Sequence, residues 1–182
     1  MDKRLIENIR VKKSIEEAMF VLLKKKKFSE ITVSDIINVS CVARASYYRN
    51  YDSKEAVIKS FIERLRDEVE QSVHFSESKS EFFNHTNLVA SLEYYLKYKY
   101  YILQLYDNGF GLLIQDMINR FVEEILGDMP SSSVERYEIY MITGAWFNTL
   151  ICWLKNGAKE SPNEIVHVYL KFLSGSRIIN EQ

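Results

Sequence analysis

The sequence predicts an all-α protein, and three observations support that prediction. Gly and Pro, which the turns of a multi-stranded β fold consume, number only 6 and 2 among 182 residues. The first glycine is Gly109 and the first proline is Pro130, so more than half of the chain must turn without either. Apolar residues recur at three- and four-residue spacing, which is typical of helices with one buried face. A hydrophobic content of 47% indicates a globular chain rather than a disordered one.

Helix-start signals and apolar spacing place each helix along the chain. Thr32, with Asp35 three residues later, has the pattern of an N-cap and capping box, and Ser161 with Glu164 repeats that pattern. Gly157 is expected to end a helix in a left-handed conformation. The predicted helices cover about residues 4–26, 33–39, 43–50, 52–69, 86–98, 99–107, 111–126, 133–156 and 162–174.

Charge is distributed unevenly between the two parts of the chain. Residues 1–60 hold 13 Lys and Arg against 8 Asp and Glu, whereas residues 61–182 hold 11 against 17. A basic N-terminal part can face nucleic acid or an anionic membrane surface, while the acidic remainder is repelled by either. A solvated helix end at residues 24–27 is the alternative explanation. We place the domain boundary after residue 52, which gives domains over 1–52 and 53–182.

The sequence offers little support for catalysis, metal binding or membrane insertion. It has no HExxH, GxSxG or P-loop motif, and a glycine-rich phosphate loop is impossible before Gly109. Cys41 and Cys152 are too few for a disulfide framework or a CxxC metal pair. The longest charge-free run, over 139–154, has 16 residues and several polar ones, too short to span a membrane. No secretory signal is recognisable. We therefore expect a cytoplasmic protein that is not an enzyme, with no cofactor, metal or membrane partner.

Two short helices joined by a tight turn after a longer first helix suggest a helix-turn-helix. The stretches 28–36 and 42–55 sharpen the suggestion, because they follow the patterns F-x-x-x-T-x-x-x-I and G-V-S-x-x-T/S-F/L-Y-x-H/Y-F-x-S-K-E at most positions. Over about residues 8–60 the chain thus resembles the DNA-binding domain of TetR/AcrR transcriptional regulators. Cys41 and Ala43 depart from the pattern, where the family prefers a Gly in the turn and a Ser cap. A missing cap costs about 1 kcal/mol, and a positive φ at Cys41 would add strain.

The resemblance implies a set of side chains that contact double-stranded DNA. Arg44 and Ser46 begin the helix that would lie in the major groove, where its first residues meet base edges. Thr32 could donate to a phosphate or be an ordinary N-cap, and Arg44 could instead be solvated surface. The resemblance gives Tyr48 and Lys54 phosphate contacts. For Tyr47 it leaves a base contact and a packing role open. The expected DNA-binding residues are Thr32, Ser34, Arg44, Ser46, Tyr47, Tyr48, Asn50 and Lys54.

The C-terminal helices predict a homodimer. The helix over 133–156 is apolar on two sides and must therefore be covered all round, by the same chain or by a partner. In the family the last two helices form the interface with the partner subunit, and a symmetric dimer reads two half-sites about 34–36 Å apart in a near-palindromic operator. A fully internal helix is the alternative. The expected interface residues are Tyr140, Gly144, Phe147, Ile151, Leu154, Val166, Tyr169 and Leu173.

The central helices contain a cluster of aromatic residues. TetR-like proteins bind small effectors between these helices, although an aromatic stripe at helical spacing is more often core. The expected residues for an unknown small-molecule effector are Tyr94, Tyr98, Tyr101, Phe110 and Trp146. The stretch 146–164 also resembles a subgroup similar to dihydroxyacetone-kinase regulators. The resemblance therefore implies a ligand-responsive, dimeric DNA-binding regulator that acts as a repressor. The alternative is a helix-turn-helix-shaped interaction module or co-activator that does not itself bind DNA.

Overall fold

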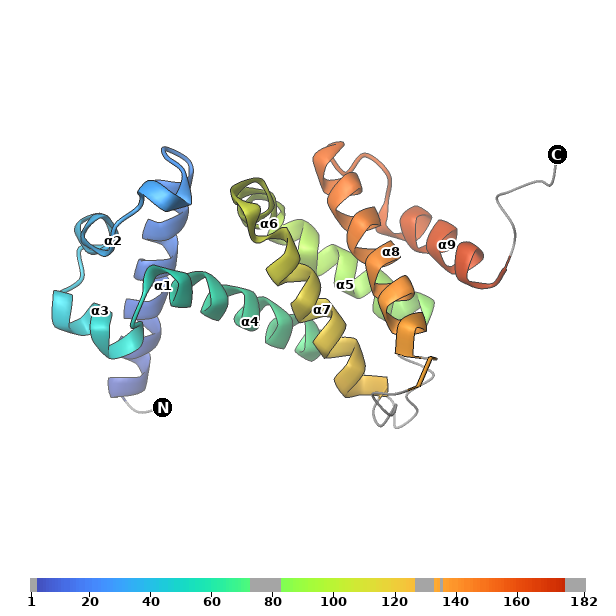
Figure 1. Cartoon of the computed structure of the whole chain (residues 1–182), viewed down its shortest axis with the longest axis horizontal. Helices are drawn as coiled ribbons and strands as arrows, with labels where there is room; N and C mark the ends of the chain where they lie inside the picture. Colours follow the sequence, from blue (N-terminus) through green and yellow to red (C-terminus); the bar gives the residue numbers. More distant parts are fainter. Residues whose placement is uncertain (1–2, 73–82, 127–132, 135, 176–182) are drawn as a thin grey trace. The chain divides into compact units, whose positions relative to one another are not determined.

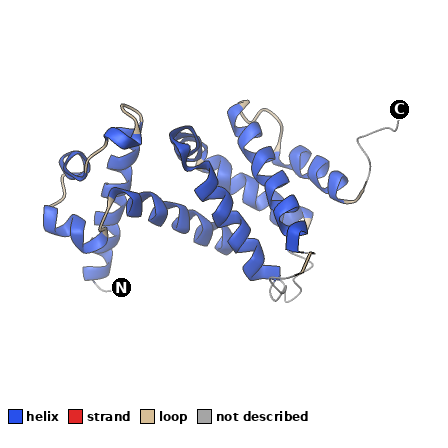
Figure 2. Cartoon of the chain, in the orientation of Figure 1, coloured by secondary structure: helices blue, strands red, loops and turns tan. Residues whose placement is uncertain are grey.

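The computed structural model describes residues 3–72, 83–126, 133–134 and 136–175, and all regular structure in these ranges is helical, as the sequence predicts (Figure 2). The chain forms two compact units. Unit 1 comprises Met1–Leu65 and Gln104–Phe110, and unit 2 comprises Arg66–Leu103 and Gly111–Gln182. The boundary therefore lies at Leu65 rather than at the expected residue 52. The reason is that the first part of α4 (Lys54–Ser72) is buried in unit 1, where Phe61 packs edge-on against Phe20.

Unit 1 is built around α1 (Lys3–Leu23), which packs against α2 (Val33–Ser40) and α3 (Arg44–Asn50) (Figure 1). Its core is formed by large side chains that are almost fully buried: Ile15, Met19, Ile36, Tyr47, Val57 and Ile58. The first helix ends three residues earlier than predicted. The backbone N–H groups of Lys25 and Lys26 both donate to the Leu22 carbonyl, which tightens the chain into a turn. A 3-10 turn, η1 (Phe28–Glu30), then leads to α2.

The helix ends of unit 1 confirm the local signals in the sequence. Thr32 is the N-cap of α2 and forms the predicted capping box with Asp35. Cys41 is the C-cap of α2 and has a left-handed backbone conformation, with φ 56°. This conformation is strained for any residue other than glycine, which the family prefers here. Ala43 precedes α3 without a side-chain cap, as its identity predicts.

Unit 2 is a set of helices in which α7 (Gly111–Leu126) packs against α8 (Arg136–Lys155), and α5 (His85–Lys97) packs against α9 (Pro162–Leu173). The short α6 (Lys99–Leu105) follows α5, and a π-helical turn, η3 (Tyr106–Phe110), precedes α7. Gly157 ends α8 at φ 98°, which confirms the predicted left-handed stop. Ser161 and Glu164 form the predicted capping box of α9. No helix in the described ranges is long and apolar enough to cross a membrane.

Candidate functional site

The first candidate site is the exposed side of α3. Arg44 begins this helix and is exposed, and its Nη2 donates a hydrogen bond of 3.0 Å to Oγ of Ser34 at the start of α2. One turn later, Tyr48 is about half exposed, and the Arg44 guanidinium lies 5.9 Å from the centre of its ring. That distance is within the range of a cation–π contact. The structure thus brings together Ser34, Arg44 and Tyr48 on one accessible surface.

Tyr47 lies on a different face of α3 from Tyr48, and the centroids of the two rings are 5.4 Å apart. Its ring is fully buried, and its hydroxyl donates to the carbonyl of Ser53 at 3.0 Å. Burial raises the pKa of Tyr47 to about 12, so the phenol stays neutral at physiological pH. The structure corrects the expectation that Tyr47 contacts DNA, because a fully buried side chain cannot reach a base. Tyr47 instead anchors α3 to the core, which is the packing role that the sequence left open.

Thr32 is bound within its own capping box. Its hydroxyl accepts from the Asp35 N–H at 3.1 Å and donates to Asp35 Oδ2 at 2.7 Å. The same carboxylate oxygen accepts a hydrogen bond from Lys26 Nζ at 2.8 Å. The Lys26 and Thr32 hydrogen bonds hold the pKa of Asp35 well below its usual range. The Thr32 hydroxyl can therefore donate to a phosphate only by giving up its hydrogen bond to Asp35.

The Lys54 side chain is directed into the protein. Its ammonium nitrogen lies 2.8 Å from the carbonyl oxygens of Phe28 and Ile31 and 3.4 Å from that of Ser29. It also lies 4.5 Å from the centre of the Phe28 ring. An ammonium group has three N–H donors, and three carbonyls accept them here. This geometry gives the ammonium group a structural role at the turn before α2, and a phosphate would have to compete with these carbonyls for its N–H donors.

The other residues expected to contact DNA, Ser46 and Asn50, are half-buried on α3. Asn50 donates its side-chain N–H to the Ser46 carbonyl at 2.8 Å, so its amide stabilises the end of α3. The Ser46 side chain is half-buried on the same helix. Arg49 is exposed in the last turn of α3, next to Tyr48, and sequence reasoning did not single it out. Its charge in a helix already expected to face DNA was the signal that could have found it.

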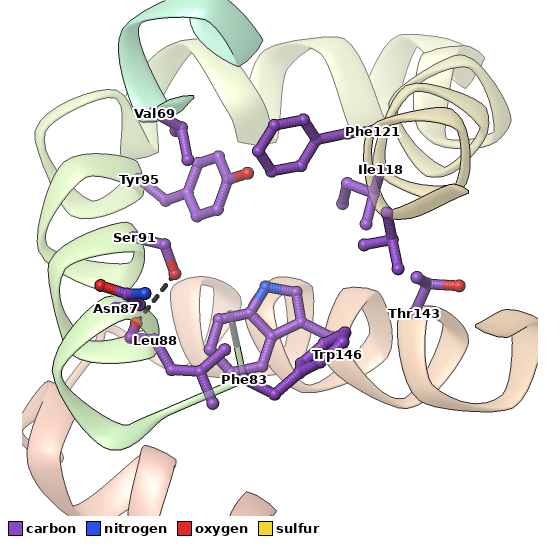
Figure 3. Close-up of a pocket in the computed structure, with 11 residues that line it drawn as sticks. Val69, Phe83, Asn87, Leu88, Ser91, Tyr95, Ile118, Phe121, Thr143 and Trp146 are labelled. Carbon is purple, nitrogen blue, oxygen red and sulfur yellow. Dashed lines mark hydrogen bonds between the residues drawn. The ribbon is translucent and has the colours of Figure 1, made fainter. Parts of the chain in front are cut away.

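The second candidate site is a cavity in unit 2, between the last turn of α4 and helices α5, α7 and α8 (Figure 3). The volume open to water is about 30 Å³, which is room for about two water molecules. Most of its lining is apolar, and no charged side chain contributes to it. The lining residues are Val69, Phe83, Asn87, Leu88, Ser91, Tyr95, Ile118, Phe121, Val122, Thr143 and Trp146.

Of the residues expected to bind an effector, Trp146 lines this cavity and the others do not. Tyr94 and Tyr98 both donate their hydroxyls to Glu68, and burial together with that hydrogen bond raises the pKa of Tyr94. Tyr101 packs its ring against that of Tyr98 instead of lining the cavity. Phe110 belongs to unit 1, where its ring packs edge-on against that of Phe28, with the ring centroids 4.8 Å apart.

Sequence reasoning missed Tyr95 because adjacent tyrosines on a helix cannot share a face, and the composition does not reveal which one faces the cavity. Two other polar residues of the lining have partners within the protein. The Ser91 hydroxyl donates to the Leu88 carbonyl at 2.8 Å. The Thr143 hydroxyl lies 2.6 Å from Asn119 Oδ1 and 2.8 Å from the Ile139 carbonyl.

A third surface lies on α8 and α9. Five of the residues expected at a dimer interface are buried within the chain: Phe147, Ile151, Leu154, Val166 and Tyr169. This corrects their assignment, because a side chain that is buried within the chain cannot contact a partner. Tyr140 is exposed, and Gly144 and Leu173 are half-buried. The large apolar side chains that α8 and α9 do expose include Met141, Val168 and Phe172.

The described residues hold no group of three or more His, Cys, Asp or Glu side chains that could bind a metal ion. The site chemistry found in the described part of the chain is therefore that of an exposed basic and aromatic helix face, an apolar cavity and an apolar helix surface.

Comparison with known proteins shows that the chain is similar to transcriptional regulators. Residues 87–175 match the TetR_C_8 family, described as a transcriptional regulator C-terminal region. The HTH-type transcriptional regulator YxbF of Bacillus subtilis (strain 168) is 30% identical over 83 residues, which are 45% of this chain. The matched residues make up 21% of the length of YxbF, so this chain spans only about a fifth of that relative.

Several solved structures have the same fold. A TetR transcriptional regulator from Streptococcus agalactiae 2603V is 23% identical and has a TM-score of 0.65, covering 93% of this chain and 97% of that one. A TetR-family protein from Syntrophomonas wolfei str. Goettingen is 16% identical, with a TM-score of 0.68 over 95% and 100% of the two chains. The dihydroxyacetone kinase operon activator DhaS is 16% identical, with a TM-score of 0.59 over 94% and 98%. All three support an all-α fold with an N-terminal helix-turn-helix.

Proposed function

Because the chain belongs to the TetR family of transcriptional regulators, whose members are not enzymes, we propose that it is a ligand-responsive repressor that binds DNA as a homodimer. In this proposal α3 enters the major groove of a near-palindromic operator in the cytoplasm. An unknown small-molecule effector binds in unit 2 and releases the protein from the operator. The effector achieves this by binding more tightly to a state with displaced recognition helices, and its differential affinity sets the loss of operator affinity.

The observation that supports DNA binding most strongly is that two adjacent tyrosines of α3 differ in exposure, one buried in the core and the other exposed. Tyr47 fixes α3 in the core, while Tyr48 and Arg44 extend from its exposed side. An arginine at the start of a groove-binding helix can donate two hydrogen bonds to a guanine edge, and a phenol can donate to a phosphate. The hydrogen bond from Arg44 to Ser34 orients the guanidinium before DNA is bound. Thr32, Ser46 and Asn50 are secondary candidates.

The homodimer is supported by the exposed apolar side chains of α8 and α9. The Tyr169 ring packs edge-on against Trp146 and its hydroxyl donates to the Ile142 carbonyl, so the two helices form one structural piece. Met141, Val168 and Phe172 lie on this piece and are exposed in the single chain. A Cβ at Gly144 would lie 3.8 Å from the side-chain nitrogen of Gln115 on α7, an ordinary contact distance. We therefore propose that Tyr140, Met141, Gly144, Val168, Phe172 and Leu173 contact the partner.

A gel-shift experiment tests the proposal. The protein is titrated into DNA from upstream of its own gene in the presence of excess unrelated duplex at moderate salt. We expect one shifted complex that survives the competitor, because specific binding exceeds bulk binding by about a thousandfold or more. A protein that binds no sequence more tightly than bulk DNA contradicts the proposal.

The alternative function is a co-activator or interaction module that keeps the helix-turn-helix shape without binding DNA. Ala43 lacks a side-chain cap and Cys41 has a strained backbone conformation, and these two departures from the family pattern favour it. Replacement of Arg44 and Tyr48 by Ala separates the two functions. Operator affinity collapses if α3 reads DNA, whereas the alternative predicts no operator affinity to lose.

A further inference from the structure

Two side chains that are more than nine-tenths buried, Tyr95 and Trp146, line the unit 2 cavity, and neither donor has a hydrogen-bond partner among the described residues. Tyr95 is only 6% exposed and Trp146 only 7%. Figure 3 shows the Tyr95 hydroxyl and the Trp146 indole nitrogen pointing into the space between α5, α7 and α8. Burial raises the pKa of Tyr95, so its hydroxyl remains a neutral donor. Buried Tyr and Trp donors ordinarily find an acceptor, so two such donors in one cavity require an explanation.

Trp153 and Tyr94 are hydrogen-bond donors of the same kinds that do have acceptors within the protein. Trp153 donates its indole N–H to the Glu160 carbonyl at 3.0 Å. Tyr94, next to Tyr95 on α5, donates its hydroxyl to Glu68. The donors of Tyr95 and Trp146 differ from these because they face a cavity and not an acceptor of the protein.

The lining of the cavity restricts the charge of any ligand. All of its side chains are uncharged, and its Ser and Thr hydroxyls have acceptors within the protein. A carboxylate or phosphate placed here loses its hydration without gaining a cation, which is a large cost. An uncharged acceptor costs much less to bury, because the two free donors replace the hydrogen bonds that it made with water.

We propose that the cavity binds an uncharged, largely apolar molecule whose oxygen acceptor receives a hydrogen bond from the Tyr95 hydroxyl, with the Trp146 indole N–H able to donate a second one. Ketones, esters and ethers have this chemistry. The inference rests on the proposed function, since this molecule is the effector. The cavity holds only about two water molecules, so the ligand displaces water and separates the aromatic side chains of the lining.

Calorimetric titration of the full chain with three six-membered-ring probes tests the ligand class. Cyclohexanone is uncharged and has an acceptor, cyclohexane has no acceptor, and cyclohexanecarboxylate is anionic. We expect cyclohexanone to bind at least tenfold more tightly than either of the others. Tyr95→Phe should weaken cyclohexanone binding roughly threefold to tenfold and leave cyclohexane binding unchanged, because it removes one hydrogen-bond donor.

Tyr94→Phe is the matched control, since it removes a hydroxyl from the same helix that does not face the cavity. This variant should bind cyclohexanone as the wild type does. Without ligand, Tyr95→Phe should melt at or above the wild-type temperature, because the hydroxyl it removes has no partner.

Three results overturn the inference: no binding of cyclohexanone, equal or tighter binding of the carboxylate, or unchanged cyclohexanone affinity in Tyr95→Phe. A gel shift on the same preparations distinguishes this failure from failure of the proposed function. A protein that retains specific DNA binding but has the wrong ligand preference refutes only the ligand class.

Discussion

The ammonium nitrogen of Lys54 lies 2.8 Å from the carbonyl oxygen of Ile31. This contact joins the first residue of α4 to the residue that immediately precedes Thr32, the N-cap of α2. The same nitrogen also reaches the carbonyl of Phe28. Lys54 therefore fixes the turn from which α2 begins, and in this way it positions the helix-turn-helix.

Lys54→Met should lower the free energy of unfolding by about 1–2 kcal/mol, because it removes hydrogen bonds from a charged donor. Affinity for DNA should fall with it, while the slope of log K against log salt concentration stays as in the wild type. A direct phosphate contact would instead reduce that slope by about one for each half-site. Anisotropy titrations at several salt concentrations measure the slope. A shallower slope of log K against log salt concentration, with an unchanged free energy of unfolding, would show that Lys54 contacts a phosphate directly.

An ion pair between buried Glu16 and partly exposed Arg64 gives unit 1 a predictable response to pH. Glu16 is buried, its Oε2 accepts a hydrogen bond of 2.7 Å from Arg64 Nη2, and burial raises its pKa above 4.5 in spite of that contact. The folded protein thus holds this proton more tightly than the unfolded chain does. Stability from Glu16 is full at pH values below 4.5 and falls as the pH rises toward the raised pKa.

Arg64→Met should therefore cost more stability at pH 7 than at pH 4.5, because the variant must bury an uncompensated carboxylate at the higher pH. We expect a loss of about 2 kcal/mol at pH 7, less than for a fully buried pair because Arg64 is partly exposed. Urea denaturation at both pH values measures the difference. Adding Glu16→Gln should remove most of the pH dependence, and equal losses at the two pH values contradict the account.

The left-handed conformation of Cys41 predicts a stabilising substitution. A non-glycine residue at φ 56° costs about 1 kcal/mol relative to glycine. Cys41→Gly should therefore raise the free energy of unfolding by about that amount, as measured by urea denaturation. Ala45→Gly, at an exposed position inside α3, is the control and should lower it by about 1 kcal/mol. Destabilisation by both substitutions would show that the turn is not strained.

The proposed dimer predicts different effects for two equally exposed apolar residues. Met141 on α8 is 72% exposed and Leu112 on α7 is 77% exposed in the single chain. Met141→Glu should give a particle of one 21.5 kDa chain in size-exclusion light scattering at micromolar concentration. The wild type and Leu112→Glu should both give twice that mass. Dissociation by Leu112→Glu alone would place the interface elsewhere.

Local signals predicted the helices and their ends well, because caps depend on a few neighbouring residues. The Thr32 and Ser161 capping boxes and the Gly157 stop lie where the sequence places them. The direction of each side chain was harder to predict. Tyr94 and Tyr95 have the same chemistry, yet Glu68, which is distant in sequence, binds one while the other faces the cavity.

The same limit explains the interface residues that were wrong. Phe147 and Met141 both belong to the apolar helix α8, and the pattern does not reveal that packing within the chain buries Phe147 and leaves Met141 exposed. Lys54 matched a family pattern, but the carbonyls that occupy its ammonium group belong to a turn more than twenty residues earlier. The sequence pattern therefore could not predict contacts between side chains and partners that are far apart in the sequence.

Sequence-specific DNA binding through Arg44 is the central claim, and one equilibrium measurement tests it most directly. A duplex is selected from a random pool, and fluorescence anisotropy at about 0.15 M salt compares it with an unrelated duplex for wild type and Arg44→Ala. The account predicts a preference of about a thousandfold or more for the selected duplex. It also predicts that Arg44→Ala weakens that binding at least tenfold while changing binding to the unrelated duplex little. Equal affinity for both duplexes, or full specificity in Arg44→Ala, would contradict it.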